Sequence, residues 1–365
     1  MQKNILVNIQ FLRAIAALMV IMYHTTGHYY AIGGEKYGNI FSLLEQFGYV
    51  GVDIFFVISG YIIWLTTRKI SNIKGIFGFI YNRATRIYLG YWAFFIPVLI
   101  FYSYLGRDMS SFDILGSFFL LTISINELLI PVSWTLSYEL YFYSLFTFLL
   151  FLPKRSIIFI LIFLFIAVIL VQTWAYFSLD IYSHSVFPTA SIVYTFFMSP
   201  YTLEFIAGCF VANYFEYRRI KNFKTIIMLG FIFLVLGVYY QNNYLGDSLA
   251  LGYYMPQRVF FFGLMSTFFL ASVVEMNKRN MLIFPRFSLM VGDASYSLYL
   301  SHIILLFIFY HIGLRGALED IASYQTLLML LLVLVIVLYS VLHYRFIEFP
   351  ILNLFKKLKK YLKLD

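Results

Sequence analysis

Charge and cysteine are both scarce in this sequence. Only 12% of its 365 residues are Asp, Glu, Lys or Arg, whereas an ordinary soluble domain carries about 25%. A water-soluble globule would lack the polar side chains to cover its surface, which excludes a soluble enzyme, a nucleic-acid-binding domain and a disordered chain. The single cysteine, Cys209, excludes a disulfide scaffold and any cysteine-based zinc site. We expect it to be a small buried apolar residue.

Several catalytic motifs are also missing. The sequence contains no P-loop, no GxSxG elbow, no HExxH zinc helix and no GxGxxG loop. Their absence argues against an ATP-driven pump, a serine hydrolase and a metalloprotease. No metal site is predicted.

Hydrophobic residues, in contrast, make up 62% of the chain, with 42 Phe and 32 Tyr. A helix needs about 20 mostly apolar residues to cross a bilayer. Ten stretches meet that requirement, so the sequence predicts an all-α fold, a polytopic transmembrane helix bundle of about ten spans. The short apolar segment 112–125 is expected to be re-entrant or interfacial. The predicted spans run roughly over 9–29, 47–66, 88–106, 134–152, 156–175, 190–213, 225–241, 257–275, 294–313 and 324–347.

The charges between the spans alternate along the chain. Lys and Arg collect in every second loop, for example Arg68, Lys69 and Lys74 after the second span, whereas the other loops carry mostly acidic residues. Because basic loops stay in the cytoplasm, both termini are predicted to be cytoplasmic. These loops account for the net charge of +9 without a nucleic-acid partner. Residues 1–350 are predicted to form one membrane domain, and 351–365 a basic tail on anionic membrane lipids.

Two ionisable residues lie in the first span. Arg13 and His24 are eleven residues apart, which returns a helix to nearly the same face, with about 16 Å between the two positions. Charged and titratable groups at membrane depth are costly, so the pair is a candidate catalytic site. The alternative is that Arg13 reaches back to the interface and His24 serves only in helix packing.

Two carboxylates enter the membrane from the outer side. Asp53 lies near the start of the second span and Glu139 near the start of the fourth, at a depth similar to that of His24. A carboxylate can fix the tautomer of an imidazole and raise its basicity, so both are candidate catalytic residues. Asp53 could instead cap its helix, and Glu139 could instead pair with a cation at membrane depth.

A pair of arginines precedes the third span. Arg83 and Arg86 are three residues apart and share one helical face. Two guanidinium groups at a cytoplasmic helix mouth suit a phosphate-bearing ligand, because Arg binds phosphate oxygens in a bidentate manner. The alternative is the ordinary excess of basic residues on the cytoplasmic side.

Three further residues are candidates for binding substrate. Trp134 and Tyr138 open the fourth span, where an interfacial aromatic belt is the competing interpretation. His302 is predicted near the middle of the ninth span, where helix–helix hydrogen bonding is equally plausible.

The predicted site therefore has arginines at the cytoplasmic mouth and a histidine with carboxylates in the outer half. A neutral imidazole can take a proton from a hydroxyl group and direct its oxygen at an activated acyl group. A phosphate-rich acyl donor such as acyl-CoA would fit the arginine end. The competing hypothesis is a proton-coupled secondary transporter that uses the same His, Asp and Glu side chains. The chain lacks the internal hydropathy repeat that many transporters show.

Six blocks of sequence then support a family resemblance. They occur in order as IQFLRAIAALMVIMYH, GVDIFFVISGY, RATR, SWTLSYELYFY, ASYSLYLSH and RFIEFP, between about residues 8 and 350. This pattern resembles the acyltransferase 3 family of multi-span membrane acyltransferases, and within it the stand-alone exopolysaccharide O-acetyltransferases of the ExoZ type.

The resemblance implies an enzyme of the inner membrane that takes acetyl-CoA, or another short acyl-CoA, as donor and a glycan or lipid-linked sugar as acceptor. It implies His24 as catalytic base, Arg13 as its essential partner, and Arg83 and Arg86 in donor binding. Leu89 stands where many members carry Pro. The SYELYFY block has one acid where many members have two, so that role falls on Glu139 alone. No further domain of the SGNH type is expected after the tenth span, so either this chain completes the transfer or a separate partner does.

Overall fold

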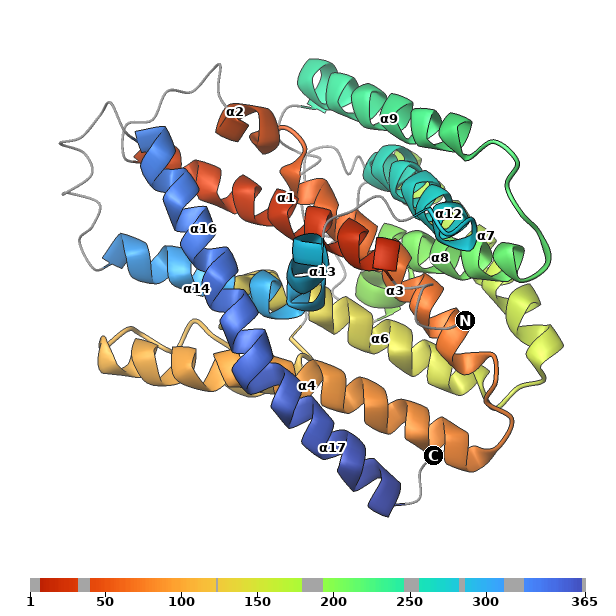
Figure 1. Ribbon diagram of the computed structural model, residues 1–365, viewed down its shortest axis with the longest axis horizontal. Coiled ribbons are helices and arrows are strands. Elements are labelled where there is room, and N and C mark those ends of the chain that lie inside the picture. Colours follow the sequence, from red (N-terminus) through yellow and green to blue (C-terminus); the bar gives the residue numbers. More distant parts are fainter. Residues whose placement is uncertain are drawn as a thin grey trace.

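A computed structural model describes residues 7–31, 40–122, 124–178, 193–245, 256–281, 286–311 and 325–362. These residues form helices and connecting turns and contain no strand, which confirms the all-α prediction. Figure 1 shows the bundle. The longer helices are α1 (Val7–Ala31), α3 (Gly51–Thr67), α4 (Ile73–Tyr104), α6 (Trp134–Leu149), α7 (Lys154–Ser178), α8 (Pro200–Tyr217), α9 (Phe223–Tyr240), α12 (Leu264–Lys278), α14 (Ser295–His311), α16 (Gln325–His343) and α17 (Phe349–Tyr361).

Each of the ten predicted ranges contains a helix. Seven continuous helices are long and apolar enough to cross a membrane. An eighth is obtained if α13 (Arg286–Asp293) and α14, which meet at a bend of 73°, are taken as one broken span. The remaining two ranges are occupied by α6, which has only 16 residues, and by α8. The protein is thus a polytopic helix bundle.

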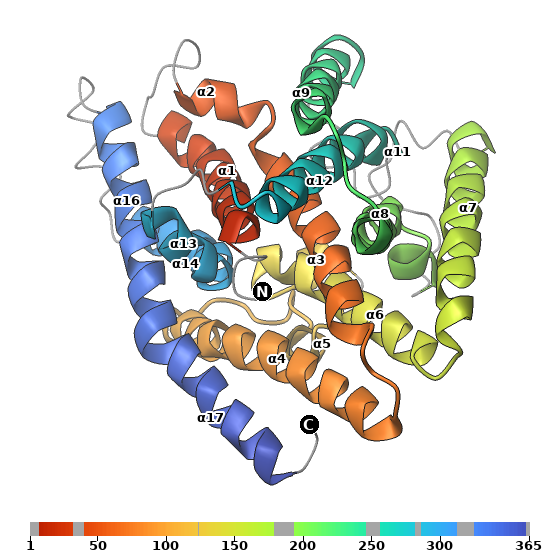
Figure 2. The same cartoon turned by 45° about the vertical axis from the view of Figure 1, so that its right-hand side comes forward.

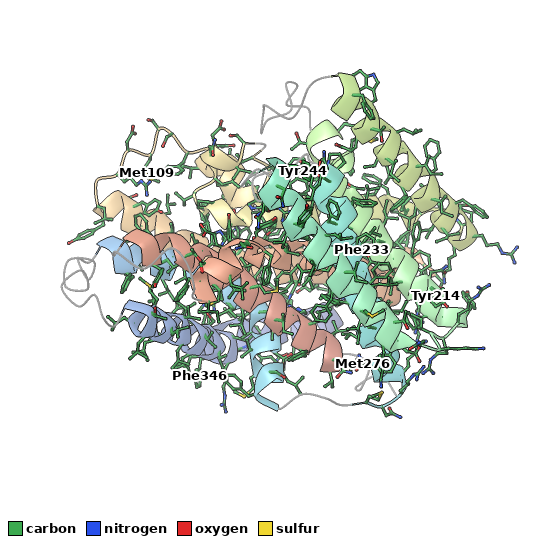
Figure 3. The ribbon with its side chains drawn as sticks, turned by 90° about the horizontal axis from the view of Figure 1, so that it is seen from above. Met109, Tyr214, Phe233, Tyr244, Met276 and Phe346 are labelled. Atoms are coloured by element: carbon green, nitrogen blue, oxygen red, sulfur yellow. The ribbon has the colours of Figure 1, made fainter. Side chains whose placement is uncertain are left out.

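Helix α3 lies at the centre of the bundle and α7 and α9 at its edge (Figure 2). In the most apolar stretch of α3, 67% of the residues are buried, whereas in that of α9 the share is 17%. Large apolar side chains are exposed on several elements of the bundle, among them Tyr214, Tyr244 and Phe346, which Figure 3 labels. A helix with apolar side chains all round its outer face requires a lipid environment, which agrees with the membrane prediction.

Glycines bring α3 and α8 into close contact. A methyl group on Gly60 would lie 1.8 Å from the carbonyl oxygen of Phe205, and one on Gly208 would lie 2.0 Å from that of Val57. Only glycine allows the two backbones to approach this closely, as is common between membrane helices. Cys209 is buried in the same contact, as expected, and its thiol lies 3.3 Å from the carbonyl oxygen of Gly60.

Three loops predicted to share one side of the membrane do lie together. Lys154 donates a hydrogen bond to the carbonyl oxygen of Arg68, and Arg68 forms an ion pair with Glu216. Arg219 donates a hydrogen bond to the carboxylate of Glu275, and this bond raises the pKa of Arg219. We call this side, formed by the loops 68–72, 150–153 and 218–222, the basic end of the bundle.

The helix in the segment 112–125, α5 (Ile114–Phe119), has six residues and is too short to be a span. It folds back against α4, where three aromatic side chains bind its carbonyl oxygens. Tyr88, Tyr91 and Trp92 donate to Phe119, Ser117 and Phe118 over 3.0, 2.9 and 3.0 Å. These bonds satisfy carbonyl groups that a short helix leaves unpaired at its end.

The basic tail continues α16 through a π-helical turn, η9 (Tyr344–Glu348), into α17. Helix α17 lies beside the start of α4, and Tyr81 donates a hydrogen bond to the carbonyl oxygen of Phe355. The last three residues of the predicted tail, 363–365, lie outside the described residues.

Candidate active site

A cavity of about 730 Å³ runs along α3 from the basic end. It is lined by α3 residues from Val52 to Thr66, a distance of roughly 20 Å along the helix axis. Lys69 and Asn72 line it at the basic end, and Phe55 lines its inner part. Figure 2 shows α3 between the helices that form the remaining walls.

Basic side chains dominate the lining of this cavity. Five basic and two acidic side chains border it among the described residues, so it carries a net positive charge that favours an anionic ligand. The basic residues are Arg13, Lys69, Arg83, Arg86 and Lys359, and the acidic ones are Glu139 and Asp293.

Neighbouring side chains hold the two arginines of α4 in place. Arg83 donates to Thr66 Oγ1 over 2.8 Å, and its guanidinium lies 5.0 Å from the ring centre of Tyr143. Arg86 lies 3.1 Å from Glu348 and 5.3 Å from the ring centre of Tyr296. The shared helical face predicted for Arg83 and Arg86 therefore lines one cavity.

Glu348 anchors Arg86 through a buried network. Its carboxylate is 2% exposed and also accepts a hydrogen bond from Ser297 over 2.6 Å. Because the Ser297 hydroxyl proton is used there, His343 Nδ1, at 2.9 Å, is the donor to Ser297. The network fixes one guanidinium edge of Arg86.

Arg13 and Glu139 both line the cavity, and each is held by neighbouring side chains. Arg13 donates to Gln10 Oε1 over 3.0 Å, and Gln10 in turn donates to Asp293 over 2.7 Å. Glu139 accepts hydrogen bonds from Ser59 and, over 2.6 Å, from Tyr143. Glu139 acts electrostatically on Arg13 and Arg86, so it partly balances the positive charge of the cavity.

His24 lies beside His302, which arrives from the other end of the sequence. His24 Nδ1 is 2.9 Å from the carbonyl oxygen of Val20 and 3.3 Å from His302 Nε2. A carbonyl oxygen can only accept, so Nδ1 carries the proton of a neutral His24 and the lone pair lies on Nε2. His302 is fully buried. The two residues thus form one pair in which His24 Nε2 is the basic nitrogen.

An aromatic wall separates this histidine pair from the cavity. Phe55 and Tyr299 form it, with ring centres 6.1 Å apart, and Tyr299 lies 5.8 Å from the ring of His302. The Tyr299 hydroxyl donates to the carbonyl oxygen of Val132 over 2.9 Å, which fixes the ring. Arg13 therefore lines the described cavity, whereas His24, on the same helix, lies behind the wall.

Asp53 lies in a different cluster. Both of its oxygens bind Arg258, over 3.1 and 2.8 Å, and both side chains are buried. Glu204 is 1% exposed and lies close enough to interact electrostatically with both Asp53 and Arg258. Two buried carboxyl groups therefore lie beside one buried guanidinium. The structure brings Asp53 to Arg258 and not to His24.

Trp134 and Tyr138 pack in an aromatic cluster with Phe56 and Tyr201. They are 8% and 3% exposed, and neither is among the residues that line the cavity along α3. Their packing is that of a helix-bundle core rather than of an interfacial belt.

Comparisons with known proteins identify the family of this chain. A family model described as "Acyltransferase domain" matches residues 6–345. The chain belongs to the acyltransferase 3 family. The protein "Exopolysaccharide production protein ExoZ" of Rhizobium meliloti (strain 1021) is 25% identical over 279 residues, which cover 73% of this chain and 78% of that protein. No solved structure matches. The predicted resemblance is confirmed, and the protein is a membrane acyltransferase.

Sequence reasoning missed three residues of this acyltransferase. Arg258 and Glu204 lie inside predicted spans, and Glu348 lies immediately after the last one. The rule that singled out Arg13, namely that a charge at membrane depth needs a reason, would have found Arg258 and Glu204 as well.

Proposed function

We propose that this acyltransferase moves an acetyl group from acetyl-CoA to a hydroxyl group of a glycan. The observation that carries the proposal is the positively charged cavity along α3, which runs from the basic end to a wall in front of the His24–His302 pair. A donor with phosphates at one end and a thioester at the other matches both ends of this path.

The phosphates of the donor would bind at the arginines. Arg83 and Arg86 can offer guanidinium edges to phosphate oxygens, and Lys69 and Lys359 add positive charge nearer the mouth. Since acetyl-CoA is a cytoplasmic metabolite, the basic end would face the cytoplasm. Both termini would then be cytoplasmic and the protein would lie in the inner membrane.

His24 would act as general base. The glycan hydroxyl oxygen attacks the thioester carbonyl carbon while His24 Nε2 takes the hydroxyl proton. A carbon–oxygen bond forms, the carbon–sulfur bond breaks with its electron pair on sulfur, and His24 returns the proton to the CoA thiolate. The products are the O-acetyl glycan and CoA.

The Phe55–Tyr299 wall would keep water away from the thioester. Rotation of one ring would join the cavity to the histidine pair and admit the acyl group. Restricting this opening to the loaded state would limit hydrolysis of acetyl-CoA.

A glycan acceptor is supported by the printed name of the relative, which refers to exopolysaccharide production. The acceptor would approach His24 from the end of the bundle opposite the basic end, because the donor occupies the cavity on the other side of the wall.

The direct test uses membranes that contain the protein, acetyl-CoA labelled in its acetyl group, and a capsular or exopolysaccharide fraction from the producing cells. The wild type should label the glycan, and His24→Ala should reduce labelling by at least about a hundredfold, the contribution of a general base. Arg155→Gln, an exposed arginine at the basic end, serves as the control and should retain activity. Undiminished labelling by His24→Ala would remove His24 as the base.

A further inference from the structure

A second cavity lies near the end of the bundle opposite the basic end. It has a volume of about 370 Å³ and is formed by α4, α14 and the stretch 129–131. Its walls are hydrocarbon and aromatic, with Val98 and Phe101 from α4 and Ile303, Ile304 and Phe307 from α14. Among the described residues that line it, Arg107 alone carries a charge.

A sharp turn after α4 places Arg107 at the rim of this cavity. Helix α4 ends at Tyr104, and Gly106 has a φ of +64°, a left-handed conformation that turns the backbone sharply. The Arg107 amide then donates back to the carbonyl oxygen of Tyr102 over 3.1 Å. The guanidinium consequently lies over the rings of Tyr102 and Phe307, at 4.6 and 5.5 Å from their centres.

The charge of Arg107 has no carboxylate partner in the described part of the chain. The neighbouring Asp108 is engaged with Ser110, whose amide and hydroxyl both donate to it over 2.9 Å. Aromatic faces stabilise a guanidinium through its flat side but leave its N–H edge available to an anion. The site therefore combines an apolar cavity with one anion-binding group at its rim.

The position of the cavity relates it to the reaction centre. Ile303 follows His302 directly, and Phe307 lies about 7.5 Å from His302 along the axis of α14. The cavity along α3 and this second cavity thus lie on different sides of the histidine pair, one toward the basic end and one toward the opposite end.

We propose that the second cavity binds the carrier lipid of the acceptor, a glycan attached through phosphate to a single polyisoprenyl chain. The first isoprene units would occupy the apolar cavity, and the phosphate would bind the Arg107 edge. A volume near the lower end of the range for ligand pockets, about 300–1,000 Å³, suits one chain rather than the two of a glycerophospholipid. A sugar on the phosphate would then lie within reach of His24. The identity of the glycan rests on the proposed function; the lipid-phosphate site does not.

The test measures binding of radiolabelled farnesyl phosphate, a short single-chain isoprenoid phosphate, to the purified full-length protein in a neutral detergent without acetyl-CoA. Saturable binding is expected, with displacement by unlabelled farnesyl phosphate. Farnesol, inorganic phosphate and dioleoyl phosphatidate should displace it at least about tenfold more weakly, because each lacks the phosphate, the chain or the single-chain shape.

Two variants locate the site. Arg107→Gln should weaken binding by about tenfold or more, as expected for loss of a charge-assisted hydrogen bond, whereas Arg155→Gln, which removes an exposed charge at the basic end, should leave it unchanged. Ile304→Trp, which fills the cavity, should also weaken binding, with its folding checked by gel filtration. If Ile304→Trp does not fold, the exposed Arg107 side chain still decides the question.

The proposal is overturned if Arg107→Gln binds as tightly as the wild type, or if any of the three competitors displaces the probe as well as farnesyl phosphate does. His24→Ala should lose acetyl transfer and still bind farnesyl phosphate. Failure of acetyl transfer and failure of lipid binding are therefore separate results.

Discussion

The proton on His24 Nδ1 lies between two acceptors, the carbonyl oxygen of Val20 at 2.9 Å and Nε2 of His302 at 3.3 Å. Both acceptors favour the tautomer with its lone pair on Nε2 of His24. His302 does not need to touch the substrate to matter for the reaction, because it orients the base.

We expect His302→Ala to lower kcat for acetyl transfer by about tenfold, because the His24 ring loses one of the two groups that orient it. The KM for acetyl-CoA should not change, since His302 lies behind the aromatic wall. His302→Gln, whose amide oxygen can accept the same hydrogen bond, should recover part of the loss. Initial rates over a range of pH values would check this. A His302→Ala enzyme with the wild-type kcat and pH profile would contradict it.

Donor recognition can be separated from chemistry by shortening the donor. Arg86→Gln should raise the KM for acetyl-CoA by about tenfold or more, because a charge-assisted contact to phosphate is lost. With S-acetylpantetheine, which has no phosphate, the variant and the wild type should have the same KM. Arg83→Gln should behave in the same way, with Arg155→Gln as the control. Equal losses with both donors would place the arginines away from the phosphates.

The sequence could single out charged residues in apolar stretches, but it could not give the neighbours of each side chain. Arg13, Arg86 and Glu139 line one cavity. Arg13 and Glu139 stood out as charges within apolar stretches, and Arg86 as one of a basic pair before the third span. Asp53, in contrast, binds Arg258, which is 205 residues away in the sequence, and periodicity does not report which helices face each other.

The aromatic wall was equally hidden from sequence analysis. Phe55 and Tyr299 are two among 42 Phe and 32 Tyr, and nothing local distinguishes a ring that closes a passage from one that packs in the core. Trp134 and Tyr138 illustrate the converse, since they come from a prominent motif and lie in the packed core.

The buried cluster around Arg258 predicts an unequal response to mutation. Arg258→Met should destabilise the protein by about 3–5 kcal/mol, because it leaves buried carboxyl groups without their cation. Asp53→Asn should cost less, since Glu204 can ionise and take over as partner of Arg258. The double variant Asp53→Asn with Glu204→Gln should again cost about 3–5 kcal/mol.

Thermal unfolding in detergent would rank these variants, with Arg155→Met as an exposed control. The cluster would have to be reconsidered if Asp53→Asn alone were as damaging as the double variant, because Glu204 would then not substitute for Asp53.

Removing one ring of the Phe55–Tyr299 wall should increase the hydrolysis of bound acetyl-CoA. Phe55 is half-buried and lines the cavity, so Phe55→Ala removes one ring of the wall without breaking a hydrogen bond and lets water reach the thioester beside His24. In the absence of glycan, CoA release should rise by roughly tenfold, equivalent to about 1.4 kcal/mol of barrier. Phe148→Ala, which removes an exposed ring from α6, should leave hydrolysis unchanged. A thiol-reactive dye would follow CoA release from both variants. If Phe55→Ala hydrolyses acetyl-CoA no faster than the wild type, the two rings do not separate the thioester from water, and the path from the arginines to His24 must run elsewhere.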